Sequence, residues 1–480
     1  MLKQPEFVQV KIDKLNQNGN GVGNVSDERG RNLTVEIPFS TPNDELKISF
    51  RKYKKNYVGK IETIVNPSPE RVEPKCIHFG TCGGCRWQNL PYQKQLELKE
   101  NKVKDLFKEL MNDQVEFRPI LGCDIPWHYR NKMEFTFSSD SYEKKYLGLI
   151  MDSSRGKVFN LTECHLVNPW YAKVVNAIRQ WWEESDLKAY HPNSNTGSLR
   201  VLTVREAFRS GDRLVMLTVS GNPDFALLNR HLQSFVTAVR ETAEENEKGG
   251  KLSIFLRIQQ ALKGVSTNFY EMHLYGSDHI RETLYVKQSA FDEPNAYHFT
   301  VSPTAFFQPN TLKAEEIYST VIELAKINQD SVVYDLYCGT GSFGLCISKY
   351  VRQVVGIELS PESVDDAKTN IRNNDVKNMT IISGAVRNVL PKITVEKIYP
   401  APDVILVDPP RPGLDPDARK NIVELNAPKI VYISCNPLTQ VNDIKEFINQ
   451  GYELKVIQPI DQFPQTIHVE NIVLLEKSLS

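Results

Sequence analysis

The 480-residue chain has no long apolar segment, no excess charge of one sign and no internal repeat. No apolar run approaches the roughly 18–20 residues that span a bilayer, and the N-terminal MLKQPEFVQV lacks the hydrophobic core of a signal peptide. The sequence therefore predicts a cytoplasmic protein that does not contact a membrane. Its 58 basic and 59 acidic side chains nearly cancel, so the net charge does not indicate a partner.

Cysteine is sparse, with eight residues, and thiols stay reduced in the cytoplasm, so a disulfide framework is not expected. Three of the eight lie close together in KCIHFGTCGGCRW, as Cys76, Cys82 and Cys85. Three thiols so close together in a glycine-rich turn predict a metal site. A fourth ligand is missing locally, and the residues alone do not distinguish zinc from iron–sulfur. The candidates for that ligand are Cys123, Cys164, His78 and His165.

The chain is long enough for roughly three domains, and three different residue patterns follow one another along it. Residues 1–66 alternate apolar and polar positions between glycine-rich turns, which predicts a small β-barrel. Its stretch KISFRKYKKNYVGK mixes basic and aromatic residues, which indicates either a solvated face or contact with nucleic acid. Residues 67–300 mix strand and helix patterns, as in an α+β domain. Residues 301–480 alternate strands and helices, which predicts a doubly wound, mostly parallel sheet. We expect one of its last two strands to run antiparallel.

The stretch YDLYCGTGSFG ends one predicted strand and opens a helix, and its glycines match the pattern G-x-G-x-x-G. Such loops bring the backbone close to a ligand at a helix N-terminus, and dinucleotides use them as well. Glu358 ends the next predicted strand, where its carboxylate can accept both ribose hydroxyls. Asp335, before the loop, can face the cationic end of a methionine group, and Asp408 precedes two prolines at a third strand end. These features favour S-adenosylmethionine over NAD.

Cys435 follows the apolar strand IVYIS and lies beside the strand that ends at Asp408. It is either a packing residue or a nucleophile. C5 of a pyrimidine does not take a methyl group unaided, but a thiolate that adds to C6 makes C5 nucleophilic. A base must then remove the C5 proton so that the cysteine can leave. Glu470, in the last pair of strands, is the candidate base.

These motifs together resemble the RNA (uracil-5-)-methyltransferases, which make 5-methyluridine in ribosomal and transfer RNA. The matching stretches are FFQPN (306–310), DLYCGTGSFG (335–344), GIE (356–358), DPPRPGL (408–414), SCNP (434–437) and HVENIVLL (468–475). The resemblance covers nearly the whole chain. It implies an α/β Rossmann-like class I methyltransferase domain, a central α+β domain and an N-terminal OB-like barrel of the TRAM type, which binds RNA.

The resemblance also assigns residues. It implies that Gln308, Tyr337, Glu358 and Asp408 bind S-adenosylmethionine, that Cys435 is the nucleophile and that Glu470 accepts the proton. It implies a [4Fe-4S] cluster held by Cys76, Cys82, Cys85 and Cys164, to which we assign a structural or RNA-positioning role. One position departs from the family pattern: Ala385 stands where Asp or Asn is expected near the adenine.

The expected reaction is C5-methylation of a specific uridine in 23S ribosomal RNA, because transfer-RNA members of the family generally lack both barrel and cluster. We expect a monomer without an obligate protein partner. Transfer RNA is the first alternative substrate. An N-methyltransferase acting on a base is another, although Arg411 replaces the aromatic residue that often follows DPP in such enzymes. A non-catalytic, RNA-binding iron–sulfur protein is the alternative from a different class. Among possible RNA contacts are Trp87, Trp127, His128, Tyr129 and Arg130, although core packing explains the tryptophans equally well.

Overall fold

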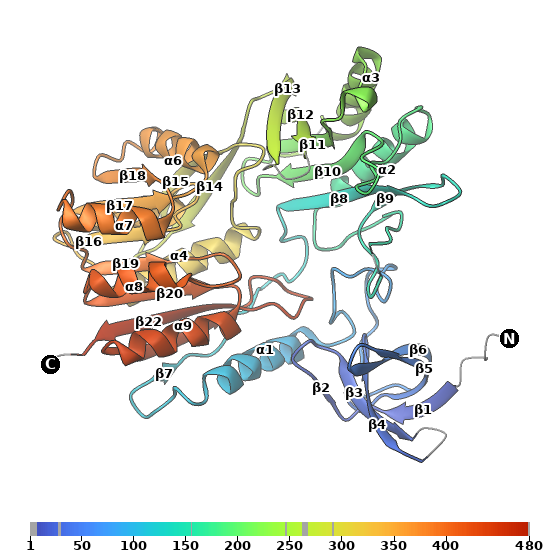
Figure 1. Cartoon of the computed structure of the whole chain (residues 1–480), viewed down its shortest axis with the longest axis horizontal. Helices are drawn as coiled ribbons and strands as arrows, with labels where there is room; N and C mark the ends of the chain where they lie inside the picture. Colours follow the sequence, from blue (N-terminus) through green and yellow to red (C-terminus); the bar gives the residue numbers. More distant parts are fainter. Residues whose placement is uncertain are drawn as a thin grey trace.

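The computed structural model describes residues 7–26, 30–154, 156–244, 247–261, 267–289 and 292–478. The N-terminal barrel and the central sheet lie on one side of the molecule, and the C-terminal α/β part lies on the other (Figure 1). Within the described residues, no helix is long and apolar enough to cross a membrane.

The N-terminal part is a six-stranded sheet in the order β1-β5-β6-β4-β3-β2, in which β1 also packs against β3. Its strands are β1 (Phe7–Lys11), β2 (Lys14–Leu15), β3 (Gly21–Ser26), β4 (Asn32–Ile37), β5 (Glu45–Tyr53) and β6 (Asn56–Asn66). Buried side chains alternate with less buried ones along β3 and the first half of β5, and Ile12, Val35 and Ile48 are among the fully buried residues. The alternation in the sequence therefore folds as a small curled sheet around its own core.

The central part is a second six-stranded sheet, in the order β13-β12-β11-β10-β8-β9. Its elements are β8 (Lys132–Ser139), β9 (Lys145–Gly148), α2 (Trp170–Glu183), β10 (Leu199–Glu206), β11 (Arg213–Ser220), the 3-10 helix η1 (Pro223–Phe225), α3 (Asn229–Ala243), β12 (Leu252–Gln260) and β13 (Asn268–Gly276). Helices α2 and α3 cover one face of the sheet and bury Trp182 and Phe235 against it.

The C-terminal part is an eight-stranded sheet in the order β18-β17-β16-β19-β20-β22-β21-β7. Its elements are α4 (Thr311–Ala325), β16 (Val332–Leu336), α5 (Ser342–Ile347), the 3-10 helix η2 (Ser348–Tyr350), β17 (Gln353–Glu358), α6 (Pro361–Asn373), β18 (Met379–Ser383), α7 (Val386–Val395), β19 (Val404–Val407), α8 (Pro416–Glu424), β20 (Lys429–Ser434), α9 (Pro437–Asn449), β21 (Tyr452–Ile460) and β22 (Glu470–Lys477). Strand β22 pairs antiparallel with both β20 and β21, as expected for one of the last two strands. This is the doubly wound sheet that the sequence predicts.

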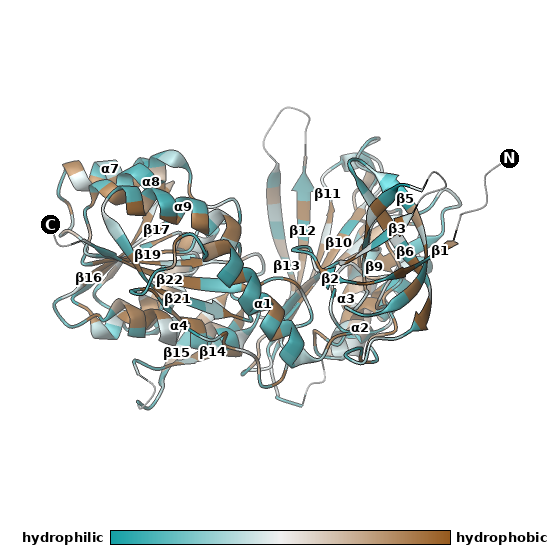
Figure 2. Cartoon of the chain, turned by 90° about the horizontal axis from the view of Figure 1, so that it is seen from below, coloured by the Kyte–Doolittle hydropathy of each residue, from teal (hydrophilic) through white to brown (hydrophobic). Residues whose placement is uncertain are grey.

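Segments that precede residue 301 complete this sheet. Strand β7 (Glu116–Phe117) pairs in parallel with β21, and helix α1 (Tyr92–Phe107) packs against α9 and β21. The hairpin of β14 (Ile280–Val286) and β15 (Asn295–Val301) covers the opposite face with α4. Figure 2 shows α1 crossing the underside of the molecule with a largely hydrophilic outer surface. Because the parallel strands share one direction, their carboxyl ends meet at one edge, where open α/β sheets bind ligands.

Candidate active site

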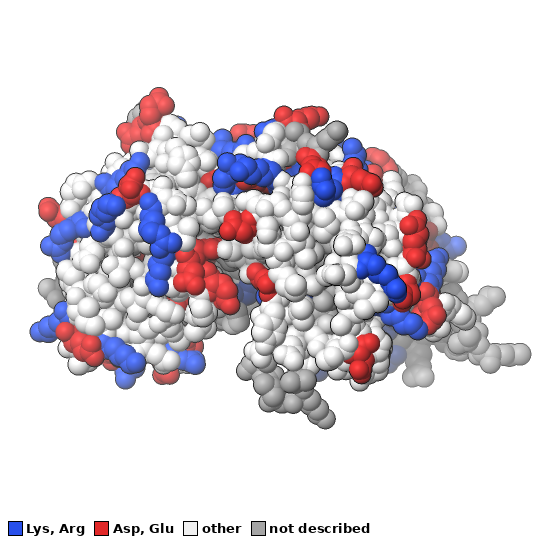
Figure 3. Space-filling view, turned by 90° about the horizontal axis from the view of Figure 1, so that it is seen from above, with Lys and Arg blue, Asp and Glu red and all other residues white. Residues whose placement is uncertain are grey.

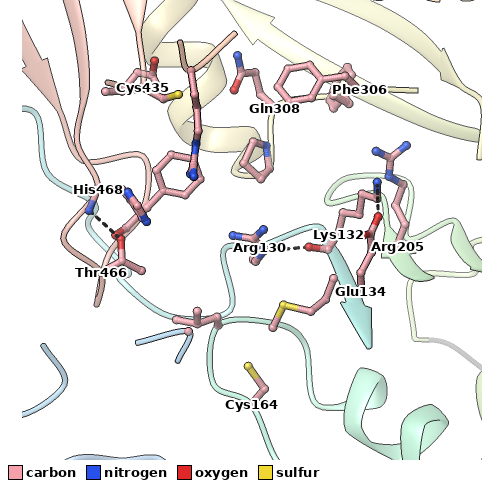
Figure 4. Close-up of a pocket in the computed structure, with 18 of the residues that line it drawn as sticks. Arg130, Lys132, Glu134, Cys164, Arg205, Phe306, Gln308, Cys435, Thr466 and His468 are labelled. Atoms are coloured by element: carbon pink, nitrogen blue, oxygen red, sulfur yellow. Dashed lines mark hydrogen bonds and ion pairs between the residues drawn. The ribbon is translucent and has the colours of Figure 1, made fainter. Parts of the chain in front are cut away.

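A cavity of about 1000 Å³ lies at the carboxyl edge of the C-terminal sheet and extends to the central part of the chain. The residues to which the resemblance assigns a role all lie on its wall: Gln308, Tyr337, Glu358, Asp408, Cys435 and Glu470 together with Cys76, Cys82, Cys85 and Cys164. Asp335 does not line the cavity. Figure 4 shows Cys435 and Gln308 on one side of this cavity and Cys164 on the opposite side. The fold therefore brings together residues that are up to 394 positions apart in the chain (Cys76 to Glu470).

The glycine loop between β16 and α5 lies beside the ends of its neighbouring strands. Gly339 and Gly341 adopt φ values of 54° and 76°, which glycine adopts without a steric penalty. Glu358 holds the loop, because its carboxylate accepts hydrogen bonds from the backbone N–H of Gly339 at 2.9 Å and of Ser360 at 2.8 Å. The loop and the carboxylate at the end of β17 thus form one rigid unit on the cavity wall.

Two carboxyl groups lie under this loop with raised pKa values. Asp335 accepts a hydrogen bond from the Gly344 N–H at 2.8 Å, yet burial raises its pKa to about 7, and the charges of Asp408 and Glu358 add to this effect. Burial alone raises the pKa of Asp408 to about 7. A cation that entered the cavity would favour the charged form of both groups and would lower these pKa values again. The site is therefore suited to a positively charged ligand such as a sulfonium.

Cys435 is half-buried directly after β20, and Glu470 is buried at the first position of β22. Burial is the largest influence on the Cys435 thiol and raises its pKa; Glu470 raises the pKa further, whereas the charge and hydrogen bond of Arg411 lower it. Burial likewise raises the pKa of Glu470, and Arg411 again acts in the opposite direction. A thiol, a carboxyl group and one guanidinium therefore form a coupled group at neighbouring strand ends.

Gln308 is buried beside the loop that joins β21 to β22. Its side-chain oxygen accepts a hydrogen bond from Gln462 Nε2 at 2.7 Å, and its backbone carbonyl accepts one from Asn131 Nδ2 at 2.8 Å. Gln308 is thus fixed from two sides. Ala385, the position that departs from the family pattern, is the N-cap residue of α7 and provides no side-chain cap.

The four predicted metal-binding cysteines converge, although their segments are far apart in the sequence. Burial is the main cause of the raised pKa values of Cys85 and of Cys164, which reaches about 12, and the charges of Cys76 and Cys82 contribute to both. Across the ranges that the structure describes, however, no group of three or more His, Cys, Asp or Glu side chains has an arrangement that could hold a metal ion. The predicted cluster is therefore not supported by the ligand geometry.

Several other expectations concern packing. Two cysteines of the C-terminal part, Cys338 and Cys346, are buried. Trp87 and Tyr129 are also buried: the indole N–H of Trp87 donates to Gly19 O at 3.2 Å, and the Tyr129 hydroxyl donates to Pro464 O at 3.0 Å. These two aromatics are core residues and are not available to stack on RNA bases.

The sequence reasoning missed the contacts of the loop between β21 and β22, which leads to Glu470. Asp461 begins this loop and is fully buried with Lys99 of α1, at 2.6 Å between Nζ and Oδ1. Gln465 exchanges two hydrogen bonds with Gln95, also of α1. The spacing of Leu96, Val103 and Phe107 places position 99 on the buried face of α1. A lysine is seldom fully buried without a partner, and Asp461 lies 362 positions away, so the sequence does not reveal this ion pair.

The doubly wound sheet, the glycine loop and the acidic strand ends define a class I methyltransferase that uses S-adenosylmethionine. Comparisons with known proteins agree with this class and narrow it. A model of the family described as tRNA (Uracil-5-)-methyltransferase matches residues 271–478.

Two relatives match over nearly their whole length. An RNA methyltransferase of Protochlamydia amoebophila is 53% identical over 443 residues, which are 92% of this chain and 99% of the relative. An RNA methyltransferase of Clostridium acetobutylicum is 34% identical over 482 residues, with 100% of this chain and 99% of the relative covered. The chain belongs to the RNA (uracil-5-)-methyltransferase family, whose members use S-adenosylmethionine.

A solved structure shares the fold. The Pyrococcus abyssi tRNA (uracil-54, C5)-methyltransferase, in complex with S-adenosyl-L-homocysteine, superposes with a TM-score of 0.71 at 23% identity. The match covers 98% of this chain and 100% of that one. The two chains therefore share a fold over nearly their whole length.

Proposed function

We propose that this methyltransferase acts through a covalent adduct between Cys435 and C6 of the target uridine, with Glu470 as the base. One observation carries the proposal: Cys435 and Glu470 stand at the ends of the adjacent strands β20 and β22, on the wall of the cavity that the glycine loop also lines. A nucleophile, a base and a donor-binding loop are thus within one enclosed space.

The proposed reaction has three steps. The Cys435 thiolate forms a bond to C6, and the electron pair of the C5–C6 double bond moves into the uracil ring as an enolate. C5 then attacks the sulfonium methyl group, and S-adenosylhomocysteine leaves. The Glu470 carboxylate takes the proton from C5, the double bond re-forms, and the Cys435 thiolate is expelled.

Arg411 is proposed to favour the reactive form of Cys435. Its hydrogen bond and charge lower the pKa of the thiol against the effect of burial. The backbone of Arg411 is fixed by the segment after the cysteine, since its carbonyl accepts hydrogen bonds from Asn436 Nδ2 at 3.1 Å and Thr439 Oγ1 at 3.3 Å. The guanidinium is thereby anchored next to the nucleophile that it stabilises.

Gln308, Tyr337, Glu358 and Asp408 are proposed to bind S-adenosylmethionine. Glu358 is supported by its position at the end of β17, where a carboxylate can accept the ribose hydroxyls. Asp408 is supported by its raised pKa, because a nearby sulfonium would stabilise the charged carboxylate. Tyr337 has φ 63° at the turn into the glycine loop, so its side chain lies beside the same space.

We propose 23S ribosomal RNA as the substrate, with transfer RNA as the second candidate. The cysteine-rich segment supports ribosomal RNA through the family resemblance. The family model is named for transfer RNA, and the Pyrococcus abyssi tRNA enzyme has the same fold over 98% of this chain, which favours the alternative. The presence of the barrel and the central sheet therefore does not distinguish ribosomal RNA from transfer RNA as the substrate. Mass-spectrometric mapping of 5-methyluridine in both RNAs from a deletion strain separates them: the modification disappears from the true substrate.

Cys76, Cys82, Cys85 and Cys164 are proposed as ligands of a [4Fe-4S] cluster. The chemistry of the donor set supports this, since it consists of thiols only and the charges of Cys76 and Cys82 raise the pKa values of Cys85 and Cys164. The ligand geometry described above does not add support. A bound cluster would hold the four sulfurs as thiolates and tie two distant segments together, and no step of methyl transfer passes through it. Iron and sulfide content of the anaerobically purified protein tests the assignment, and Cys164→Ser should lower both.

The proposed reaction has a direct test. RNA labelled with tritium at C5 of uridine should release the label when it is incubated with the enzyme and S-adenosylmethionine. RNA that contains 5-fluorouridine should form a stable adduct at Cys435, because a fluorine at C5 cannot be removed as a proton is. An N-methyltransferase or a non-catalytic binding protein would give neither result.

A further inference from the structure

His468 lies on the cavity wall just before β22, among four cationic side chains. Desolvation, as the largest cause, and the charges of Arg411, Lys102, Lys99 and Arg130 together lower the pKa of His468 to about 4. The imidazole is therefore neutral at pH 7 and carries one N–H donor. Within the described ranges, no hydrogen bond engages the ring nitrogens of His468, although its backbone N–H donates to Thr466. The ring is thus free to donate to a ligand in the cavity.

Two of the four cations already have an assigned partner. Lys99 is bound to Asp461, and Arg411 contacts the Cys435 thiol. Arg130 donates from Nε to Lys132 O at 2.9 Å, and Lys102 donates to Ile467 O at 3.4 Å. Both of these partners are neutral carbonyl groups, and the described part of the chain holds no carboxylate in ion-pair contact with Arg130 or Lys102. Arg130 lines the cavity, and Lys102 lies near enough to His468 to lower its pKa, and neither of these two positive charges has a counter-ion among the described residues.

The positive charge of the Arg and Lys side chains around His468 lies inside the site. On the outer face shown in Figure 3, Lys and Arg alternate with Asp and Glu, in keeping with the nearly balanced composition. In the close-up, Arg130 and His468 project toward the same space below Cys435 (Figure 4). These positive side chains are therefore placed to bind a negatively charged ligand within the cavity.

The order of the strands decides which ligand this is. The glycine loop and Glu358 lie at β16 and β17, Cys435 lies at β20, and His468 lies at β22. In the strand order, Cys435 thus lies between His468 and the glycine loop and Glu358, which are proposed to hold S-adenosylmethionine. A uridine whose base reaches Cys435 extends its sugar and phosphates away from the methyl donor, toward β22 and the loop before it.

We propose that Arg130 and His468, with the added charge of Lys102, bind a phosphodiester group next to the target uridine. This inference rests on the proposed function, because it assumes an RNA substrate whose uracil reaches Cys435. The guanidinium and the imidazole N–H are the donors, and the phosphate oxygens are the acceptors. The contact holds the backbone while the base leaves its stack.

The salt dependence of RNA binding tests the charge. Each lost phosphate contact lowers the slope of log affinity against log salt concentration by about 0.7 for a single strand or about 0.9 for a duplex. Arg130→Gln should lower the slope by this amount and weaken binding roughly tenfold. Arg130→Lys should retain the slope. His468→Leu should weaken binding at an unchanged slope, because the imidazole is neutral. The control Lys377→Gln, at the opposite edge of the sheet with 85% of its side chain exposed, should change neither quantity.

A backbone substitution locates the contact. The probe is the RNA hairpin that the wild-type enzyme methylates, with an uncharged methylphosphonate placed 5′ or 3′ to the target uridine. At one of these positions the substitution should weaken binding to the wild-type enzyme roughly tenfold and should not weaken binding to Arg130→Gln further. If the two effects multiply at both positions, the phosphate assignment is overturned.

Two further outcomes separate this inference from the proposals on which it rests. A higher KM for S-adenosylmethionine in Arg130→Gln, at an unchanged salt slope, means that these cations bind the carboxylate of the methyl donor and overturns the assignment. If the wild-type enzyme forms the 5-fluorouridine adduct but Arg130→Gln keeps the full slope, the phosphate site fails alone. If the wild-type enzyme forms no adduct, the proposed function fails, and the phosphate site fails together with it.

Discussion

Replacing Lys99 by Met removes the cation from an ion pair that is fully shielded from water. Both side chains have 0% exposure, and the Nζ–Oδ1 distance to Asp461 is 2.6 Å. The same ammonium donates to Phe463 O at 3.0 Å. After the substitution, the donors that remain to the Asp461 carboxylate among the described residues are the Tyr92 hydroxyl at 2.8 Å and the Phe463 N–H at 3.2 Å. Loss of one partner from a buried pair costs about 3–5 kcal/mol, because the other charge stays buried without compensation.

Lys104 of the same helix provides a matched control. Its ion pair with Glu100 is nearly as short, at 2.7 Å, but the two side chains are 44% and 22% exposed. Exposed pairs of this spacing contribute roughly 0.3–0.5 kcal/mol, and lysine and methionine have similar helix propensities. Lys104→Met should therefore lower the Tm of the C-terminal domain by about 2 °C or less, against roughly 6–20 °C for Lys99→Met.

Thermal unfolding followed by circular dichroism measures both changes. Adding Asp461→Asn to Lys99→Met should recover part of the lost stability, since the unpaired carboxylate is then gone. Equal losses for Lys99→Met and Lys104→Met would contradict the reasoning, because burial would then have no effect. A double variant less stable than Lys99→Met alone would contradict it as well.

Three further predictions concern the reaction and its donor. Cys435→Ala should abolish tritium release and the 5-fluorouridine adduct while S-adenosylmethionine still binds in equilibrium dialysis; retained methylation would rule out the covalent route. Arg411→Gln should move the pH–rate profile to higher pH, because the cation that lowers the pKa of the Cys435 thiol is lost and the thiolate forms later as pH rises; Arg411→Lys keeps the charge and should move it less, and equal shifts would refute the electrostatic role. Gly344→Ala would place a Cβ 2.5 Å from Met379 Cε and 2.9 Å from Val354 Cγ1. The substitution should therefore lower the free energy of unfolding by about 1–3 kcal/mol and raise the KM for S-adenosylmethionine. An unchanged KM would show that the loop accommodates the methyl group.

The N-terminal and C-terminal sheets could be predicted because their patterns are local. Alternating apolar residues in 1–66 and the alternation of strands and helices after 301 follow from burial on one or both faces of a sheet. The two-residue strand β7 could not be predicted, because Glu116–Phe117 is too short to show a period and gains its partner only when β21 is in place.

The sequence by itself determined the glycine loop, the acidic strand ends and the position of Cys435 after a buried strand, since each depends on neighbours within a few residues. Only the tertiary structure decided that Lys99 is buried with Asp461, 362 positions away, and that Arg130 and Lys102 gather around His468. Helix periodicity places position 99 on the buried face of α1, but a lysine there is expected to reach solvent unless a distant carboxylate pairs with it. Such charges acquire their role from long-range packing, on which local propensity has no influence.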